Sequence, residues 1–252
     1  MKWYFILAIA VGCMLFLILI SSIFYRVFFK RFWDIFFSGL GLIILLPLLL
    51  LVGLLVRIKL GKPIIFKQTR PGKNGELFQM HKFRSMLPSQ TKDGRILSDE
   101  ERLECLKNGI DILSDEERLT KFGKIIRALS LDELPELWNI FKGDMSFVGP
   151  RPLATIYLPF YTKEEFHRHD VRPGLTGLAQ VNGRNSILWK EKFEFDLKYV
   201  KSYSFFGDLA IIIKTFLVVF KRKNIGQGTE TPESFNISRQ KEWNNGTVIR
   251  DR

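Results

Sequence analysis

Two long apolar runs lie within the first 56 residues of the chain, and no other sequence feature limits the possible folds as strongly. The first run, from Trp3 to Tyr25, contains no charged residue. At about 1.5 Å per residue, a helix of this length reaches across the roughly 30 Å hydrocarbon core of a bilayer. A signal peptide is the weaker alternative, because the run exceeds an h-region and no small-residue cleavage site follows it. We therefore expect a transmembrane helix within residues 1–28.

The second run, from Phe32 to Val56, is interrupted by Asp34 and Pro47. It is flanked by basic residues on both sides, Arg26, Lys30 and Arg31 before it and Arg57, Lys59, Lys62, Lys67 and Arg70 after it. Basic flanks stay in the cytoplasm, and a helix that crosses the membrane cannot place both of them there. A re-entrant helix over residues 29–60 that bends at Pro47 would satisfy both flanks, since proline interrupts helical hydrogen bonding. The charge pattern and the proline alone support two alternatives equally, a re-entrant helix and a kinked helix that crosses the membrane.

The composition restricts the class of protein and of partner. The 252 residues include 38 Lys and Arg against 26 Asp and Glu, a net charge of +12, and 46% of them are hydrophobic. These values exclude a disordered tail protein, a disulfide scaffold and a collagen-like chain. The excess of positive charge suggests anionic partners, namely lipid, phosphate or nucleic acid. The two cysteines and three histidines show no zinc-site spacing.

Two features of the middle of the chain predict local structure. Residues 63–84 predict a β-hairpin with a turn at Pro71–Gly75. Residues 96–103 recur identically at residues 112–119, and each copy contains a serine that can cap a short helix. Two copies are too few for a solenoid. We interpret the repeat as a local duplication that lengthens a surface helical region, and we assign it no chemistry.

Residues 132–142 have the pattern of a short amphipathic helix. Its predicted buried stripe consists of Leu134, Leu137, Trp138 and Phe141, at i, i+3, i+4 and i+7 spacing. Pro135 is tolerated only in a first helical turn, so the helix should begin near Asp132 and end at Gly143.

Two adjacent carboxylates, Asp132 and Glu133, therefore stand at a predicted helix N-terminus, where the helix dipole favours negative charge. Arg127 lies shortly before them. By themselves these residues favour a structural interpretation, in which Asp132 caps the helix and Glu133 is an ordinary first-turn acid.

Three glycine- or proline-rich loops carry arginine. In Pro150-Arg151-Pro152 the backbone is stiff, so the arginine loses little entropy when it binds phosphate. The segments Arg172–Gly177 and Gln180–Arg184 repeat the combination, and the backbone N–H groups of such loops suit anions. A solvated arginine on a rigid loop is the plain alternative for any one of them. Three in one chain favour anion binding.

The apolar residues between Phe206 and Phe220 lie on one face of a predicted helix, interrupted by Asp208 and Lys214. The helix either belongs to the core or lies in the interface of an anionic leaflet. Three basic residues follow it at 221–223, and each base near such a surface adds about 1 kcal/mol of attraction. We favour the interfacial alternative, and we expect the polar tail from Gly226 to be mobile.

Several motifs follow one another along the chain in one order. They are Lys30-Arg31-x-x-Asp34, Pro47, Phe66-x-Gln68-x-Arg70-Pro71-Gly72, Lys82-Phe83-Arg84-Ser85-Met86, Ser130-Leu131-Asp132-Glu133-Leu134-Pro135, Lys142-Gly143-Asp144-Met145-Ser146-Phe147-Val148-Gly149-Pro150-Arg151-Pro152, Arg172-Pro173-Gly174-x-Thr176-Gly177 and Gln180-Val181-Asn182-Gly183-Arg184. Together they resemble the bacterial sugar transferases, the monotopic phosphoglycosyl transferases that act on polyprenyl phosphate. The resemblance covers residues 29 to 225, and residues 1–28 and one copy of the repeat look like additions to the minimal family core.

The resemblance implies an α+β, mainly helical fold in four parts. These are an N-terminal transmembrane helix (1–28), a re-entrant membrane helix bent at Pro47 (29–60), a compact cytosolic catalytic domain with a small hairpin and interfacial helices (61–225), and a polar tail (226–252). In the family the re-entrant helix is broken at a Ser-Pro pair. Here Leu46 occupies the serine position, so Pro47 alone must hold the bend. The implied location is the bacterial inner (cytoplasmic) membrane, with the catalytic domain facing the cytoplasm.

The activity that the resemblance implies is transfer of a sugar-1-phosphate from a UDP-sugar to undecaprenyl phosphate, with release of UMP, as the first membrane step of glycoconjugate synthesis. Asp132 would be the covalent nucleophile and associate with Mg²⁺, with Glu133 as its catalytic partner. The residues expected to bind substrate or phosphate are Lys82, Arg127, Arg151, Arg172, Gln180 and Arg184, and those expected to shape the backbone are Pro47, Pro150 and Pro152.

The expected partners are therefore a UDP-sugar, undecaprenyl phosphate and anionic membrane lipid, and not nucleic acid. A non-catalytic, basic membrane-anchored scaffold that binds anionic lipid or nucleic acid is the alternative from another class. A scaffold would not require the Asp132–Glu133 pair beside Arg127. The motifs do not identify the sugar, and we lean weakly to an N-acetylated one because the minimal form of the family often uses it.

Overall fold

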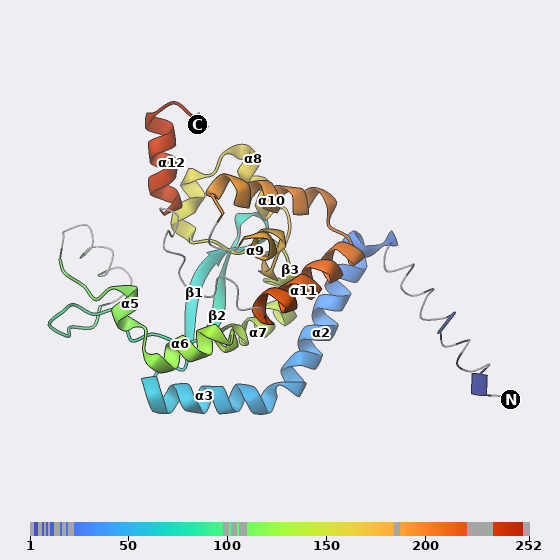
Figure 1. Cartoon of the computed structure of the whole chain (residues 1–252), viewed down its shortest axis with the longest axis horizontal. Helices are drawn as coiled ribbons and strands as arrows, with labels where there is room; N and C mark the ends of the chain where they lie inside the picture. Colours follow the sequence, from blue (N-terminus) through green and yellow to red (C-terminus); the bar gives the residue numbers. More distant parts are fainter. Residues whose placement is uncertain are drawn as a thin grey trace. The chain divides into compact units, whose positions relative to one another are not determined.

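The structure is a computed structural model of the chain (Figure 1). It describes residues 3, 4, 7, 9, 11, 12, 16 and 19, and then 23–97, 101, 105, 110–183, 187–220 and 234–248. The chain divides into two compact units. Unit 1 comprises Met1–Leu40, Thr69–Gln79 and Asn139–Arg252, and unit 2 comprises Gly41–Gln68 and Met80–Trp138.

The described residues are mainly helical and include two small sheets, which confirms the α+β, mainly helical prediction (Figure 1). The α-helices are α2 (Lys30–Ile44), α3 (Leu46–Leu60), α5 (Asp115–Arg118), α6 (Lys121–Ala128), α7 (Glu136–Lys142), α8 (Lys163–Phe166), α9 (Leu178–Asn182), α10 (Trp189–Ser202), α11 (Phe205–Phe220) and α12 (Phe235–Asn244). A π-helical segment, η1 (Tyr25–Phe29), precedes α2, and the 3₁₀ turns are η2 (Lys73–Gly75), η3 (Leu131–Glu133), η4 (Thr155–Phe160) and η5 (His167–His169). Strands β1 (Ile65–Pro71) and β2 (Leu77–Phe83) pair as the predicted hairpin, and β3 (Ser146–Val148) pairs in parallel with β4 (Gly174–Thr176).

The second apolar run is broken where the sequence predicts a bend. Helices α2 and α3 meet at an angle of 64°, and the break lies at Leu45, two residues before Pro47. The N–H of Leu45 still donates to the carbonyl of Gly41, and its own carbonyl accepts from Leu49. Pro47, in the first turn of α3, has no N–H to donate to the carbonyl of Ile43, so the helix restarts instead of continuing. The break therefore forms without the serine of the family's Ser-Pro pair.

Within the described part of the chain, no single helix has both the length and the apolar character required to cross a membrane. The bent pair formed by Tyr25–Ile44 and Leu46–Leu60 meets those requirements when it is taken together, by length and composition. Half of residues 1–28 lie outside the described set, so the transmembrane helix predicted there stays a prediction.

Helix α3 forms one side of the core of unit 2. Val52 and Val56 are buried against Phe83 of β2 and Ile126 of α6. The partly buried hydrophobic residues packed against this cluster are Leu48, Leu49, Leu60, Ile64, Ile65, Phe122, Leu131 and Leu134. The other side of α3 exposes Leu50, Leu51, Leu54 and Ile58. An apolar helix with one packed face and one bare apolar face is suited to lie against lipid.

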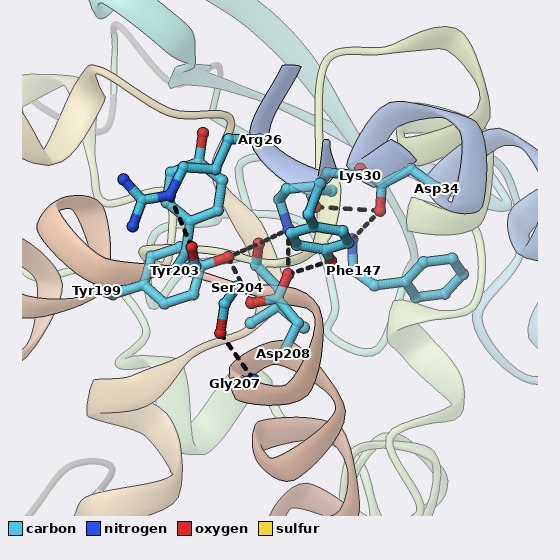
Figure 2. A network of polar contacts seen from close by, with 12 residues as sticks. Arg26, Lys30, Asp34, Phe147, Tyr199, Tyr203, Ser204, Gly207 and Asp208 are labelled. Carbon is cyan, nitrogen blue, oxygen red and sulfur yellow. Dashed lines mark hydrogen bonds and ion pairs between the residues drawn. The ribbon is translucent and has the colours of Figure 1, made fainter. Parts of the chain in front are cut away.

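A buried polar network explains why Asp34 and Lys30 occur beside the apolar run. Lys30 Nζ lies 2.5 Å from Asp208 Oδ2 in α11 and 3.0 Å from the carbonyl of Val148 (Figure 2). One turn later, Asp34 Oδ1 accepts hydrogen bonds from the N–H of Phe147 and the hydroxyl of Ser146, both at 3.1 Å. Both side chains therefore hold α2 to β3, a contact between residues more than 100 positions apart in sequence.

The two arginines before the apolar run bind carbonyl groups at helix C-termini in unit 1. Arg26 donates to the carbonyls of Tyr203 and Lys201 at the end of α10, at 2.9 and 3.1 Å. Arg31 donates to Ile140 and Phe141 near the end of α7, at 2.6 and 2.7 Å. Helix C-termini leave carbonyls unsatisfied and carry partial negative charge, which these guanidinium groups neutralise. The basic flank that predicts membrane topology is thus also part of the fold.

The exposure of the side chains of helix α11 argues against one of the two sequence alternatives. The apolar face predicted from spacing is exposed, since Phe206, Ile213 and Phe216 are each more than half exposed. Asp208 and Ile211, on the opposite face, are buried. The core-helix alternative is therefore wrong for the predicted face, and an apolar surface of this kind suits a membrane interface.

Part of the C-terminal tail, which its polar composition predicts to be mobile, forms the packed helix α12. Phe235 of α12 is 1% exposed and lies among the rings of Tyr157, Tyr161, Trp189 and Phe193. Arg239 of the same helix forms an ion pair with Glu165. One fully buried aromatic residue is enough to dock a short polar helix, and average composition conceals it.

The second copy of the duplicated segment forms the predicted capped helix. Ser114 accepts from the N–H of Glu117, whose side chain in turn accepts from the N–H of Ser114, so α5 begins with a capping box. Most of the first copy lies outside the described residues.

Candidate active site

The Asp132–Glu133 pair lies in the short turn η3 rather than at the start of a longer helix. Helix α7 begins only at Glu136, so the predicted helix start near Asp132 is wrong by one turn. The turn is entered through Ser130, whose φ of 55° and ψ of 22° are left-handed. A non-glycine residue in this region costs on the order of 1 kcal/mol, and the packing of Leu131 and Leu134 into the core of unit 2 offsets that cost.

The predicted apolar stripe of α7 is also only partly correct. Leu137 is buried, but Trp138 and Phe141 are 49% and 39% exposed, while Ile140 is fully buried. The packed side of this helix also includes the polar residue Asn139, which is fully buried, so apolar spacing alone did not identify that side. Glu136 shares the buried side and is 1% exposed, which the sequence pattern did not predict.

Lys82 connects two acidic residues of the site. Its Nζ lies 2.7 Å from Glu133 Oε1 and 3.0 Å from Glu136 Oε1. Strand β2 carries Lys82 to this position. Ion pairs between partly buried groups are strong because little water screens them, so Lys82 fixes the direction of Glu133.

The surroundings of Asp132 raise the pKa of its carboxyl group above the ordinary value. Its side chain is only 9% exposed, and this burial raises the pKa of its carboxyl group, with the neighbouring charge of Glu133 raising it further. The positive charges of Lys82 and Arg127 act on the same pKa in the opposite direction. A carboxylate held out of water next to a second carboxylate is costly to keep ionised, and such groups concentrate at functional sites.

Arg127 is held beside the pair by the segment that follows β2. Its Nε donates to the hydroxyl of Ser85 at 2.8 Å, and its Nη2 lies 2.9 Å from Met86 Sδ. Helix α6, which carries Arg127, approaches this segment closely, since a Cβ at Gly123 would lie 1.8 Å from the carbonyl oxygen of Ser85. Ser85 was not predicted as a site residue, although it belongs to the same motif as Lys82.

Unit 1 contains the other predicted phosphate-binding residues. Arg151 is exposed between Pro150 and Pro152, which are both buried, so its backbone is held as the sequence predicts. Arg172 Nε donates to the carbonyl of Gly143 at 2.8 Å, and Gln180 Nε2 donates to the carbonyl of Leu175 at 3.0 Å. These last two side chains thus have structural contacts, and their role in binding phosphate stays a prediction. Arg184 lies outside the described residues.

Two of the arginine loops are joined through the β3–β4 pair. The N–H of Gly149 donates to the carbonyl of Thr176 at 2.9 Å, and that of Gly174 donates to the carbonyl of Pro150 at 3.0 Å. A Cβ at Gly174 would lie 2.1 Å from the nitrogen of Gly149, so only glycine permits this approach. The loops that carry Arg151 and Arg172 are therefore neighbours, which their separation in sequence did not reveal.

The donor set around Asp132 fits a magnesium ion of the kind that binds together with substrate. Among the residues that the structure describes, no three His, Cys, Asp or Glu side chains are grouped so as to hold a metal on their own. Mg²⁺ usually takes one or two protein carboxylates and completes its shell with water and substrate phosphates. Asp132, with Glu133 beside it, supplies such carboxylates, and a cation there would favour the ionised form of Asp132.

Comparison with known proteins agrees with the motifs. A family model described as bacterial sugar transferase matches residues 25–222, a range that includes every candidate site residue. The uncharacterized sugar transferase EpsL of Bacillus subtilis is 48% identical over 172 residues, which are 68% of this chain and 77% of that protein.

Two further relatives have more specific names. The undecaprenyl-phosphate galactose phosphotransferase of Salmonella typhimurium is 39% identical over 196 residues, 77% of this chain and 41% of that protein. The UDP-glucose:undecaprenyl-phosphate glucose-1-phosphate transferase of Klebsiella pneumoniae is 40% identical over 201 residues, 77% of this chain and 40% of that protein. The chain thus spans about two fifths of the length of these two relatives. It belongs to the bacterial sugar transferase family and is an enzyme.

Proposed function

We propose that this enzyme transfers a sugar-1-phosphate from a UDP-sugar to undecaprenyl phosphate and releases UMP. The observation that carries the proposal is the buried Asp132 carboxylate, which lies beside Glu133 in a site containing Lys82 and Arg127. The names of the Salmonella and Klebsiella relatives, which include undecaprenyl phosphate as acceptor, support the substrate class. The basic-scaffold alternative is not favoured, because the family is one of transferases.

The proposed chemistry has two steps at one phosphorus atom. In the first, a carboxylate oxygen of Asp132 attacks the β-phosphorus of the UDP-sugar, and the anhydride bond breaks so that UMP leaves with the bridging oxygen. In the second, a phosphate oxygen of undecaprenyl phosphate attacks the same phosphorus and the Asp132 carboxylate leaves. A covalent intermediate lets a soluble donor and a lipid acceptor use the same site in turn.

Charge is the main obstacle to the first step. A carboxylate and a phosphate oxygen 4 Å apart repel each other by about 1 kcal/mol in water, and by more in a drier site. Lys82 and Arg127 offset part of this repulsion, and Lys82 is already shared with Glu133 and Glu136. Bound Mg²⁺, held by Asp132 with Glu133, would supply further positive charge where negative charge develops.

The proposed location is the cytoplasmic face of a bacterial membrane. The bent pair of helices α2 and α3 would be the re-entrant segment, and the exposed apolar face of α11 would lie in the interface. This arrangement would bring the site to the level of lipid headgroups, where the phosphate of the acceptor lies. Anionic lipid is a further expected partner, given the net charge of +12.

The test is incubation of the purified enzyme with radiolabelled UDP-sugars, undecaprenyl phosphate and Mg²⁺. We expect lipid-linked label and UMP from at least one UDP-sugar, with an N-acetylated sugar as a weak first choice. Asp132→Asn should abolish both products, whereas Asp115→Asn, at an exposed helix N-terminus, should retain them. With donor alone, wild type should gain the mass of a phosphosugar on Asp132. An unmodified Asp132 in an active enzyme would indicate direct, one-step transfer instead.

A further inference from the structure

The backbone of the Pro150-Arg151-Pro152 loop is held from inside unit 1 by a second arginine. Arg168 Nη2, in η5, donates to the carbonyl of Arg151 at 2.7 Å. The Arg168 side chain is 2% exposed, so its guanidinium group is fully enclosed by protein. The buried Arg168 thus binds the backbone carbonyl of Arg151, whose own side chain is exposed.

Arg168 is itself fixed by an acid on α10 and by two aromatic rings. Its Nε and Nη2 donate to Asp196 Oδ2 at 3.0 and 2.7 Å, and the Asp196 side chain is 5% exposed. The guanidinium carbon lies 5.8 Å from the ring centres of both Tyr161 and Phe193. A planar guanidinium held at its edge by a carboxylate and near two rings has little freedom to move.

This contact completes the restraint on the loop. Gly149 and Pro150 are already hydrogen-bonded to the neighbouring loop at Thr176 and Gly174, and both prolines fix their φ angles. The carbonyl of Arg151 lies beyond these bonds, and Arg168 is the group that anchors it. The direction in which the Arg151 side chain leaves the loop then depends on Arg168 and, through it, on Asp196.

We propose that Arg168 and Asp196 are positioning residues for Arg151, which they aim at an anionic group of the donor substrate. This inference rests on the proposed function, in which Arg151 binds phosphate. It assigns the buried pair a role in substrate binding beyond its contribution to stability.

The chain offers a matched control for a purely structural role. Arg239 and Glu165 form another buried ion pair in unit 1, with side chains 5% and 14% exposed. Arg239 also contacts Glu242 and the ring of Phe235, and all three of these partners lie outside the Pro150–Pro152 loop. Arg239→Lys should therefore report the general cost of altering a buried arginine that does not bind the carbonyl of Arg151.

The first experiment is a double-mutant cycle on UMP release in the full-length enzyme. Arg151→Ala should lower kcat/KM for the UDP-sugar about 10- to 100-fold, mainly through KM, because a charge-assisted hydrogen bond is lost. Arg168→Lys keeps the positive charge but removes the planar guanidinium group. It should lower kcat/KM roughly 10-fold in the otherwise wild-type enzyme and less than about 2-fold in the Arg151→Ala background. Asp196→Asn should behave like Arg168→Lys. The inference would be overturned if the losses caused by Arg168→Lys and Arg151→Ala were additive, or if the Arg151→Ala single variant lost no activity. Either result would leave the transferase activity established.

The second experiment does not depend on catalysis. Hydrogen exchange of a peptide that covers residues 150–154 should be faster in Arg168→Lys than in wild type, and unchanged in Arg239→Lys. Equal exchange in wild type and Arg168→Lys would show that the loop is not anchored by this contact and would overturn the inference. Absence of UMP release by wild type with every UDP-sugar tested would instead contradict the proposed function, and the exchange result would still decide whether Arg168 anchors the loop.

Discussion

Lys82 Nζ lies 3.0 Å from Oε1 of Glu136, a carboxylate that is almost completely buried. The same ammonium group lies 2.7 Å from Glu133, so one lysine compensates two acids around the turn that carries Asp132. Removing positive charge from beside the Glu136 carboxylate is costly, because water does not reach this group. The site therefore contains a positive charge that is fixed before any substrate binds.

The first prediction concerns Lys82 and Glu136. Lys82→Met should lower the free energy of unfolding by about 3 to 5 kcal/mol, because it removes a positive charge that lies 3.0 Å from a buried carboxylate. Adding Glu136→Gln should recover a large part of this loss, giving a coupling energy of about 1 to 3 kcal/mol. Denaturant unfolding of the two single variants and the double variant in detergent measures the coupling. Strictly additive effects would contradict an ion pair between these residues.

The second prediction is that Asp132 is retained at a cost in stability. Because the pKa of Asp132 is higher in the folded protein than its ordinary value of 3.8, folding favours the protonated form. Above both pKa values the ionised carboxylate destabilises the fold, and this penalty disappears as the pH falls toward 3.8. Asp132→Asn should thus raise the free energy of unfolding at pH 7 by on the order of 1 kcal/mol, although it abolishes transfer.

The gain in stability from Asp132→Asn should depend on pH. The difference between Asp132→Asn and wild type should be largest near neutral pH and should shrink as the pH approaches 4. Thermal unfolding across this pH range measures it, with Asp115→Asn as an exposed control that should change little at any pH. A variant less stable than wild type at pH 7 would show that Asp132 is a structural cap, the interpretation that the residues alone favoured.

The third prediction distinguishes basic residues that stabilise the fold from those that face solvent. Arg31→Gln removes two hydrogen bonds to carbonyls near the end of α7 and should cost about 1 to 3 kcal/mol of stability. Arg57→Gln, at an exposed position near the end of α3, should stay within about 0.5 kcal/mol of wild type. Unfolding of both variants in the same detergent gives the comparison, and equal effects would argue against the Arg31 contacts.

The fourth prediction concerns membrane topology. Single cysteines at Phe28 and Lys59, in a background without Cys13 and Cys105, report the two ends of the bent pair, and both positions are exposed. A re-entrant segment predicts that an impermeant thiol reagent labels both cysteines from the cytoplasmic side. Labelling from opposite sides of the membrane would establish a kinked span and would require a different placement of the site.

The fifth prediction concerns the close approach of the two arginine loops. In Gly174→Ala the new Cβ would lie 2.1 Å from the nitrogen of Gly149 and 2.3 Å from the carbonyl oxygen of Thr176, so β3 and β4 would have to separate. We expect a loss of at least about 3 kcal/mol or failure to fold. In Gly41→Ala the Cβ would meet only Leu137, at 3.6 Å, and the helix should gain up to about 1 kcal/mol. Unfolding of both variants makes the comparison, and a stable Gly174→Ala protein would show that the loops are less tightly joined.

Features that depend on neighbouring residues could be predicted from the amino-acid sequence. The turn at Pro71–Gly75, the capping box at Ser114 and the break near Pro47 each arise from backbone preferences within a few positions, and each is present. The ordered motifs also identified the family and the acidic pair, because their residue types and spacing are specific. The helical spacing of the apolar residues predicted which face of α11 is apolar. It did not predict whether that face is buried in the core or exposed.

Which of these residues contact one another depends on how the chain packs in three dimensions. Lys30 contacts Asp208 across 178 positions and Arg168 contacts Asp196 across 28, and no local pattern indicates either pair. The same limit explains the errors in α7 and in the tail, where Trp138 is exposed and Phe235 is buried against expectation. Whether a polar or apolar side chain is buried depends on the partner that packing brings to it, and burial in turn sets the pKa of Asp132 and makes Glu136 depend on Lys82.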